Sequence, residues 1–325
     1  MKAAVIERQG GVENIVYRDW PDPEIGPDDV LVRVRACALN HLDIFVRRGM
    51  PGFPVPMPFI SGGDIAGEVA AVGANVTRFR QGDRVSLNPQ TDEGMIGEEL
   101  LGGLAELVRV PAKNVIAIPD HLEFVPAAAT PIAYGTALRM LVTRARLEAG
   151  ETVLVLGASG GVGIASVQIA KMLGARVVAV AGSAAKCARL LDVGADEAID
   201  MSSNDFSREA WHLSGKQGVD LCVNFTGGDT YVPSLRTLRK GGRLVTCGAT
   251  AGFDPQTDLR FVWVRELQVI GSNSYTQEDV AQALDHVAAG RLQPVIGATF
   301  PLAELAAAET LIEQREVFGK IVLLP

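Results

Sequence analysis

The sequence is poor in cysteine, in clustered basic residues and in long apolar stretches. Its four cysteines include no Cys-x-x-Cys pair, so we expect reduced thiols and no disulfide framework. No apolar run approaches the roughly 18 residues that a membrane-spanning helix needs, and the N-terminal apolar run is too short for a signal peptide. The expected location is therefore the cytoplasm, with no membrane partner.

Charge and length set further bounds. The formal net charge of −8 argues against a nucleic-acid partner, because duplex binding draws on clustered Lys and Arg. A hydrophobic content of 48% with 21% charged residues is typical of a globular protein. At 325 residues the chain is too long for one ordinary compact core, so we expect two domains.

Two kinds of pattern follow one another along the chain. Residues 1 to about 120 are rich in short strands, such as 30–36, where Val30, Val32 and Val34 alternate with arginines. Helix is expected at 125–147, and then near-continuous apolar strands alternate with helices at 161–173, 184–193 and 229–238. Further helices are expected at 277–290 and 302–315. The fold class is therefore α/β, a β-rich domain with an inserted doubly wound parallel sheet.

A glycine-rich loop in VLVLGASGGVGIASVQIAKMLG (153–174) is the strongest local signal. An apolar strand leads into Gly157, Gly160, Gly161 and Gly163, and then into a helix. Glycines here permit a tight turn, let backbone N–H groups approach a pyrophosphate and allow the helix to pack close to its strand. The helix N-terminus adds positive potential for phosphates. This pattern predicts a dinucleotide site, in preference to a turn that binds nothing.

The end of the next strand indicates which dinucleotide binds. NAD sites usually carry Asp or Glu about 20 residues after the glycines, where it accepts hydrogen bonds from the ribose. Here Gly182 and Ser183 stand at that position, and Lys186 follows within one helical turn. The hydroxyl, the helix N-terminus and the ammonium would favour the 2′-phosphate of NADPH. The alternative makes Ser183 an ordinary N-cap and Lys186 an exposed surface lysine.

Several segments together resemble the medium-chain dehydrogenase/reductase superfamily, in its zinc-free quinone oxidoreductase (zeta-crystallin-like) and enoyl reductase branch. They are MKAAVIERQGG, VLVRVRACALN, GGDIAGEVAAVG, QGDRV, GASGGVG, LRKGGRLVTCGA and GKIVLL. The resemblance implies a GroES-like catalytic domain with an inserted Rossmann domain, a cleft between them for cofactor and substrate, and a homodimer formed through the Rossmann sheet edge. We assign residues 1–122 to the first part of the catalytic domain, 123–266 to the Rossmann domain, and 267–325 to the last Rossmann strand and the return to the catalytic domain.

The resemblance also locates the positions of zinc ligands. In zinc-dependent alcohol dehydrogenases the first ligand is a cysteine in a Cys-His-x-Asp pattern, and the aligned residue here is Asn40. The second is the histidine of a Gly-His-Glu triplet, which reads Gly62-Gly63-Asp64 here, and the third is a cysteine where this chain has residues 130–132, Thr-Pro-Ile. Tetrahedral zinc needs three or four Cys, His or carboxylate ligands, so we expect no metal.

In place of the ligands the chain has Asn40-x-x-Asp43-x-x-x-Arg47-x-Gly49, which is similar to a signature of the quinone reductase branch. The Asn40 amide can donate a hydrogen bond to a substrate carbonyl or to the nicotinamide carboxamide, but it cannot supply a proton. Asp43 and Arg47 have i,i+4 spacing, and we expect an ion pair that fixes this loop, either for catalysis or as a solvated turn. His41 is expected to contact the pyrophosphate or relay a proton, unless it is a local structural partner.

These residues favour an NADPH-dependent reductase of quinones or α,β-unsaturated carbonyls that works without zinc. Conjugate reduction needs only hydrogen-bond donors at the developing enolate oxygen, with a proton taken from water. Two alternatives stay open: an alcohol or carbonyl dehydrogenase of the zinc-type lineage, and a non-enzymatic, crystallin-like NADPH-binding scaffold.

The expected site residues fall into three groups. The catalytic ones are Asn40, Asp43 and Arg47. The cofactor contacts, several of them implied by the resemblance alone, are His41, Thr136, Gly160, Gly161, Val162, Gly182, Ser183, Lys186, Thr226, Gly248, Ala249, Ser272, Asn273 and Lys320. The aromatic candidates for a substrate pocket, each of which core burial would explain equally well, are Phe45, Phe53, Tyr134, Phe253, Trp263 and Tyr275.

Overall fold

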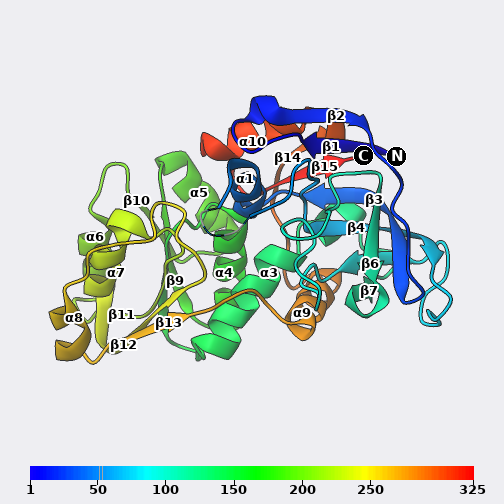
Figure 1. The fold of residues 1–325 in the computed structure, drawn as a ribbon. Coiled ribbons are helices and arrows are strands. Elements are labelled where there is room, and N and C mark those ends of the chain that lie inside the picture. Colours follow the sequence, from blue (N-terminus) through cyan, green and yellow to red (C-terminus); the bar gives the residue numbers. More distant parts are fainter. Residues whose placement is uncertain (51, 53) are drawn as a thin grey trace. The chain divides into compact units, whose positions relative to one another are not determined.

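The computed structural model describes all residues of the chain except 51 and 53, so the expected pocket residue Phe53 lies outside the described residues. The chain forms two compact units (Figure 1). The first contains Met1–Gly135 and Tyr275–Pro325, and the second contains Thr136–Ser274. Among the described residues, no helix is both long and apolar enough to span a membrane.

The first unit is built on a seven-stranded sheet in the order β14-β15-β3-β4-β5-β7, with β6 paired to β3. Its strands are β3 (Asp29–Ala38), β4 (Asp64–Val72), β5 (Arg84–Leu87), β6 (Leu107–Pro111), β7 (Val115–Ala117), β14 (Ile296–Pro301) and β15 (Lys320–Leu324). A separate hairpin joins β1 (Lys2–Ile6) to β2 (Ile15–Asp19). The last strand, β15, pairs antiparallel with β3, and Figure 1 shows the red C-terminal strand beside the blue one.

The alternation expected in β3 is confirmed. Val30, Val32 and Val34 are buried in the core of the first unit, whereas Arg33 and Arg35 on the opposite face are exposed. Burial of one face of this strand fixes its register, because a slip of one residue would exchange the two sets of side chains. The end of β3 and the start of β15 are therefore held at defined positions beside each other.

The segment after β3 is a helix, α1 (His41–Arg48), where a loop was expected. The Asp43 carboxylate accepts the backbone N–H of Asn40 at 2.8 Å, which is one half of a capping box. The expected ion pair between Asp43 and Arg47 is wrong. The fully buried Arg47 side chain instead pairs with Glu309 and Glu313 of α10 (Leu305–Glu313), because it lies on the helix face that packs there while Asp43 caps the first turn.

The helix expected over 125–147 is divided into three. It consists of α2 (Phe124–Ala128), α3 (Pro131–Leu138) and a π-helical segment over Arg139–Arg144. Pro131 accounts for the first break, since proline starts helices readily and cannot continue them. Because α2 packs on β3 and β4, residues 123–135 belong to the first unit, and the boundary lies later than the expected one at residue 122. The other long helix of this unit is α9 (Gln277–Ala288).

The second unit is a six-stranded, fully parallel sheet in the order β10-β9-β8-β11-β12-β13. Its strands are β8 (Thr152–Val155), β9 (Arg176–Ala181), β10 (Glu197–Asp200), β11 (Val219–Val223), β12 (Leu238–Thr246) and β13 (Gln268–Gly271). Its helices are α4 (Gly161–Met172), α5 (Ala184–Val193), α6 (Phe206–Leu213), α7 (Tyr231–Thr237) and α8 (Leu259–Val264). Numbered within the unit, the strand order is 3-2-1-4-5-6, which is the Rossmann order. The expected fold class is confirmed, although α6 and α8 were not expected.

Candidate active site

The glycine-rich loop of the second unit has the geometry that its sequence predicts. Gly157 adopts a φ of 63° in the turn after β8, a conformation that favours glycine. A Cβ at Gly163 would lie 2.3 Å from the carbonyl oxygen of Gly157, so only glycine lets α4 pack this close to its strand. The loop therefore delivers the N-terminus of α4, with its free N–H groups, to the carboxyl end of β8.

Three other glycines lie at the carboxyl ends of strands, although the packing of the fold does not require glycine there. A Cβ at Gly182, Gly248 or Gly271, which follow or end β9, β12 and β13, would meet no atom within 4 Å. At Gly160 it would meet only the Gly157 carbonyl, at 3.7 Å. None of these four residues has a positive φ. Glycine there keeps space open along one edge of the sheet, which is where Rossmann sheets bind dinucleotides.

Among the residues after β9, Ser183 has the N-cap role of the alternative interpretation, and its contact with a 2′-phosphate stays a prediction. Ser183 is the N-cap of α5, and its hydroxyl accepts the backbone N–H of Lys186 at 3.3 Å. Sequence reasoning missed Asp200, which ends the neighbouring strand β10. Hydrogen bonds from Ser202 and from the backbone N–H of Ala184 hold the pKa of this half-buried carboxyl below its usual range. A carboxylate therefore lies at the N-terminus of α5, close to Ser183.

The loop after β11 is held by a buried amide. The Asn224 side chain, 1% exposed, accepts the backbone N–H groups of Thr226 and Gly227 and donates to the hydroxyls of Thr230 and Ser234. Thr226 was an expected cofactor contact, and its position is set by this network. The strand-end position of Asn224 was the sequence signal for it.

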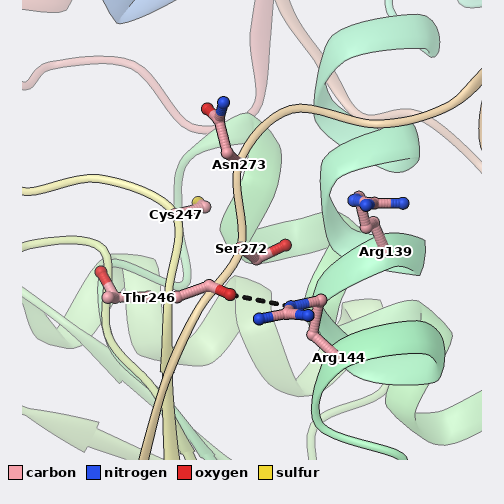
Figure 2. A pocket seen from close by; sticks show the side chains of 7 residues that line it. Arg139, Arg144, Thr246, Cys247, Ser272 and Asn273 are labelled. Atoms are coloured by element: carbon pink, nitrogen blue, oxygen red, sulfur yellow. Dashed lines mark hydrogen bonds between the residues drawn. The ribbon is translucent and has the colours of Figure 1, made fainter.

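A pocket of about 390 Å³ opens beside the carboxyl ends of β12 and β13 (Figure 2). It is lined by Arg139, Arg144, Thr246, Cys247, Gly271, Ser272 and Asn273. Two of the expected cofactor contacts, Ser272 and Asn273, are among them, whereas the two arginines were not expected. The Arg144 guanidinium donates to the Gly271 carbonyl at 2.8 Å and so fixes the end of β13. Thr136, another expected contact, lies in α3 and is buried.

The first unit contains a polar cluster made of the half-buried Asn40 and the buried Asp64 and Lys320. The Lys320 ammonium donates to the Asn40 Oδ1 at 2.6 Å and to the Asp64 Oδ2 at 2.8 Å. The Asn40 Nδ2 donates to the same Asp64 oxygen at 2.9 Å, and the backbone N–H of Ile132 donates to the Asp64 Oδ1 at 2.7 Å. The Asp64 and Lys320 side chains are 0% and 4% exposed, so the ion pair is almost fully desolvated.

The three segments that align with zinc ligands meet at this cluster through Asn40, Asp64 and the backbone of Ile132, and the donor set does not fit zinc. Asn40 is engaged with Asp64 and Lys320, and the backbone of Ile132 is engaged with Asp64. A Cβ at Gly63 would lie 2.9 Å from the Ile96 carbonyl oxygen and 3.1 Å from the Ile132 Cδ1, so no histidine side chain has room there. In the described part of the chain, no three His, Cys, Asp or Glu side chains gather as a metal site.

Asp43 makes contacts that hold the backbone in place. Its carboxylate accepts the N–H of Asn40 at 2.8 Å and the N–H of Gly62 at 2.8 Å, and it is 2% exposed. Burial raises the pKa of Asp43 to about 7, although the Asn40 N–H opposes this shift. The carboxylate thus ties together the segments that carry Asn40 and Asp64.

Two expected cofactor contacts lie in the first unit. His41 is exposed at the start of α1, and its ring is tilted against that of Phe45 with 6.5 Å between centroids. Lys320 lies in the polar cluster, where its ammonium is bound to Asn40 and Asp64. Contact of either residue with a cofactor stays a prediction.

Comparison with known proteins agrees with this architecture. An alcohol dehydrogenase GroES-like domain matches residues 26–120, and a zinc-binding dehydrogenase domain matches residues 161–289. The quinone oxidoreductase of Homo sapiens is 32% identical over 332 residues, which cover 100% of this chain and 98% of that protein. The chain belongs to the medium-chain dehydrogenase/reductase superfamily, in its quinone oxidoreductase branch. It is an oxidoreductase of that superfamily, for which a nicotinamide cofactor is expected.

Other members of the superfamily lie at similar distances. The acryloyl-coenzyme A reductase of Metallosphaera sedula is 32% identical, covering 99% of this chain and 99% of that protein. A crystal structure of an NAD-dependent alcohol dehydrogenase is 37% identical, with a TM-score of 0.95 and full coverage of both chains. The residues that match the zinc-binding dehydrogenase domain include none of the three segments that align with zinc ligands. The name of that domain therefore says nothing about a metal in this chain.

The open glycine at position 248 provides a test of the cofactor edge. We expect Gly248→Val to leave the melting temperature within about 2 °C of wild type, since a Cβ meets no protein atom there. Dinucleotide affinity should fall at least about 10-fold, because the side chain would fill the space kept for the ligand. Fluorescence titration with NADPH and with NADH, together with thermal melts, measures both effects.

The matched control is Gly163→Ala, whose Cβ would lie 2.3 Å from the Gly157 carbonyl oxygen. This variant should melt at a clearly lower temperature. Unchanged dinucleotide binding by Gly248→Val would show that the open edge is not the cofactor site.

The buried ion pair makes a second prediction. Lys320→Met leaves the Asp64 carboxylate buried without its counter-charge, so the free energy of unfolding should fall by about 3–5 kcal/mol. The double variant Asp64→Asn/Lys320→Met should regain much of this loss, because neither charge then remains. Urea unfolding of the two single variants and the double variant measures the coupling. Additive losses would contradict a direct interaction between these side chains.

Proposed function

We propose that the protein is an NADPH-dependent reductase of quinones or α,β-unsaturated carbonyl compounds that works without zinc. The observation that carries this proposal is the hydrogen-bonded cluster of Asn40, Asp64 and Lys320, in which Asn40 stands at the position that the resemblance aligns with the first zinc ligand. An ammonium ion and an amide offer hydrogen bonds but no Lewis-acidic coordination site. Such a cluster suits a reaction in which charge develops on an oxygen already conjugated to the reacting carbon.

The donors of the cluster can be counted. Lys320 has three N–H groups and uses two of them, on Asn40 and Asp64, and the Asn40 amide uses one of its two, on Asp64. Each residue therefore retains one N–H for a substrate oxygen. When hydride adds to the β-carbon of an enone, the C=C electron pair moves onto the α-carbon and the carbonyl oxygen, and water supplies the proton to the α-carbon. The remaining N–H groups would stabilise the charge on that oxygen.

NADPH would supply the hydride. The residues proposed to hold it are those of the glycine loop and of the open strand ends: Gly160, Gly161, Val162, Gly182, Ser183, Lys186, Thr226, Gly248, Ala249, Ser272 and Asn273. The absence of an acid after β9 supports NADPH over NADH, with Ser183 and Lys186 beside the 2′-phosphate. Asp200 works against a 2′-phosphate at that place, so we expect a preference for NADPH and not strict selectivity.

The relatives support this reading of the substrate class. A quinone oxidoreductase and an acryloyl-coenzyme A reductase, by their names, act on conjugated acceptors. The similar NAD-dependent alcohol dehydrogenase favours a second candidate, reversible oxidation of an alcohol with NAD. The deciding experiment is NADPH oxidation across 1,4-quinones, enones and acryloyl thioesters, with simple ketones as the control. Turnover of ketones alone would favour the second candidate, and binding of NADPH without any turnover would favour a scaffold.

Cofactor preference can be tested in both directions. Ser183→Ala/Lys186→Ala should lower the ratio of kcat/KM for NADPH over NADH by about 10- to 100-fold, since two charge-assisted contacts to the 2′-phosphate are lost. Asp200→Asn should raise the same ratio, because a like charge beside the phosphate is removed. Steady-state kinetics with one acceptor measures both variants. A ratio that neither variant changes would place the selectivity elsewhere.

We also propose a homodimer formed by the second unit. Among the described residues, β13 pairs with β12 alone, and exposed apolar side chains lie on it and on the segment that leads into it: Phe253, Leu259, Trp263, Val264 and Val269. An unpaired strand with a neighbouring apolar surface suits a second copy of itself, because a two-fold axis can pair the same edge of both chains. Trp263→Asp should shift the mass measured by light scattering from dimer to monomer. The control is Leu191→Asp, an exposed apolar position on α5, which contacts β9 and β10 at the other end of the sheet, and a monomeric wild type would contradict the proposal.

A further inference from the structure

Tyr275 has a buried hydroxyl without a partner. The residue is 6% exposed, and its phenol oxygen makes no hydrogen bond within the part of the chain that the structure describes. Buried polar groups are almost always hydrogen-bonded, because leaving one unpaired in an apolar environment is costly. A buried hydroxyl without an acceptor therefore indicates that a molecule other than this chain supplies the acceptor.

The ring itself is firmly placed. Tyr275 directly precedes the N-cap of α9, where Thr276 and Asp279 exchange backbone and side-chain hydrogen bonds at 2.8 and 3.2 Å. In the position before an N-cap, an apolar ring typically packs on the residue four places into the helix, here Val280. A Cβ at Gly135 of α3 would lie 3.1 Å from the Tyr275 ring and 3.2 Å from Val280, so both pack against that glycine. This packing fixes the position of the ring, but it provides no hydrogen-bond partner for the hydroxyl.

The Tyr275 ring packs against Gly135, three residues after Ile132 in α3, and the Ile132 N–H binds Asp64, so Tyr275 lies close to the polar cluster. Burial raises the pKa of Tyr275 well above its ordinary value, and the negative charges of Asp64 and then Glu98 raise it further. The phenol therefore stays protonated and can only be a donor toward a ligand oxygen. Asp64 is the carboxylate that holds Asn40 and Lys320, so the tyrosine belongs to the same neighbourhood of the first unit.

We propose that Tyr275 donates a hydrogen bond to the carbonyl oxygen of the bound substrate, an enone or a quinone, and stabilises the charge that develops there during reduction. This inference rests on the proposed function and adds a third donor to the N–H groups of Asn40 and Lys320. No proton is transferred by the tyrosine. Its hydrogen bond strengthens as the oxygen becomes more negative, so its contribution belongs to kcat more than to KM.

The test is Tyr275→Phe, which keeps the packed ring and removes only the hydroxyl. With 2-cyclohexenone and NADPH, kcat should fall about 10- to 100-fold while the Kd for NADPH stays unchanged. The melting temperature of the ligand-free protein should be equal to or higher than that of wild type, since no internal hydrogen bond is lost. The control is Tyr231→Phe, a partly buried tyrosine of the second unit, which should behave as wild type.

Two outcomes would overturn the proposal: a kcat within threefold of wild type, or a lowered melting temperature, which would reveal a structural partner for the hydroxyl. Binding of cyclohexanone, an unreactive carbonyl probe, separates this inference from the proposed function. If wild-type protein reduces none of the 1,4-quinones, enones and acryloyl thioesters, the proposed function fails, but Tyr275→Phe should still weaken cyclohexanone binding. Equal affinity of the two proteins for cyclohexanone would then reject the role of Tyr275.

Discussion

A carboxylate removed from water needs donors that replace its hydration, and Asp64 obtains three from three different parts of the chain. The Asn40 amide comes from the start of α1, the Ile132 N–H from the start of α3, and the Lys320 ammonium from the first residue of β15. Each of these elements must therefore reach the same point before the charge can be buried. The C-terminal strand is part of the site for this reason, and not simply the last strand of the sheet.

Further contacts, made by Asp43 and Arg47, hold the segments around this cluster in place. Asp43 binds the backbone of Asn40 and of Gly62, so the two segments that carry Asn40 and Asp64 cannot move independently. Arg47, one turn further along α1, is anchored by Glu309 and Glu313 of α10. Two residues of the Asn-x-x-Asp-x-x-x-Arg signature thus hold the segment that carries the third, Asn40. In the proposed mechanism, Asn40, Lys320 and Tyr275 donate to the substrate from segments distant in sequence.

Much of the architecture could be predicted because it depends on local patterns. The alternation of Val30, Val32 and Val34 and the spacing of Gly157, Gly160 and Gly163 specify a strand and a nucleotide loop through short-range sterics. Contacts between segments distant in sequence do not produce a local sequence pattern, so they could not be predicted in this way. Lys320 follows a glycine in an ordinary strand, and nothing in GKIVLL indicates that its ammonium meets Asn40. The pairing of Arg47 was predicted wrongly, because i,i+4 spacing allows an ion pair with Asp43 but cannot reveal a better partner on α10.

The central claim is that an ammonium and an amide act where related enzymes use a metal. The most direct test is to measure zinc and other transition metals by mass spectrometry in purified protein, and NADPH oxidation with an enone before and after dialysis against a chelator. The account predicts far less than one metal ion per chain and undiminished activity after dialysis. Near-stoichiometric zinc, with activity that is lost on chelation and restored by adding zinc, would contradict it.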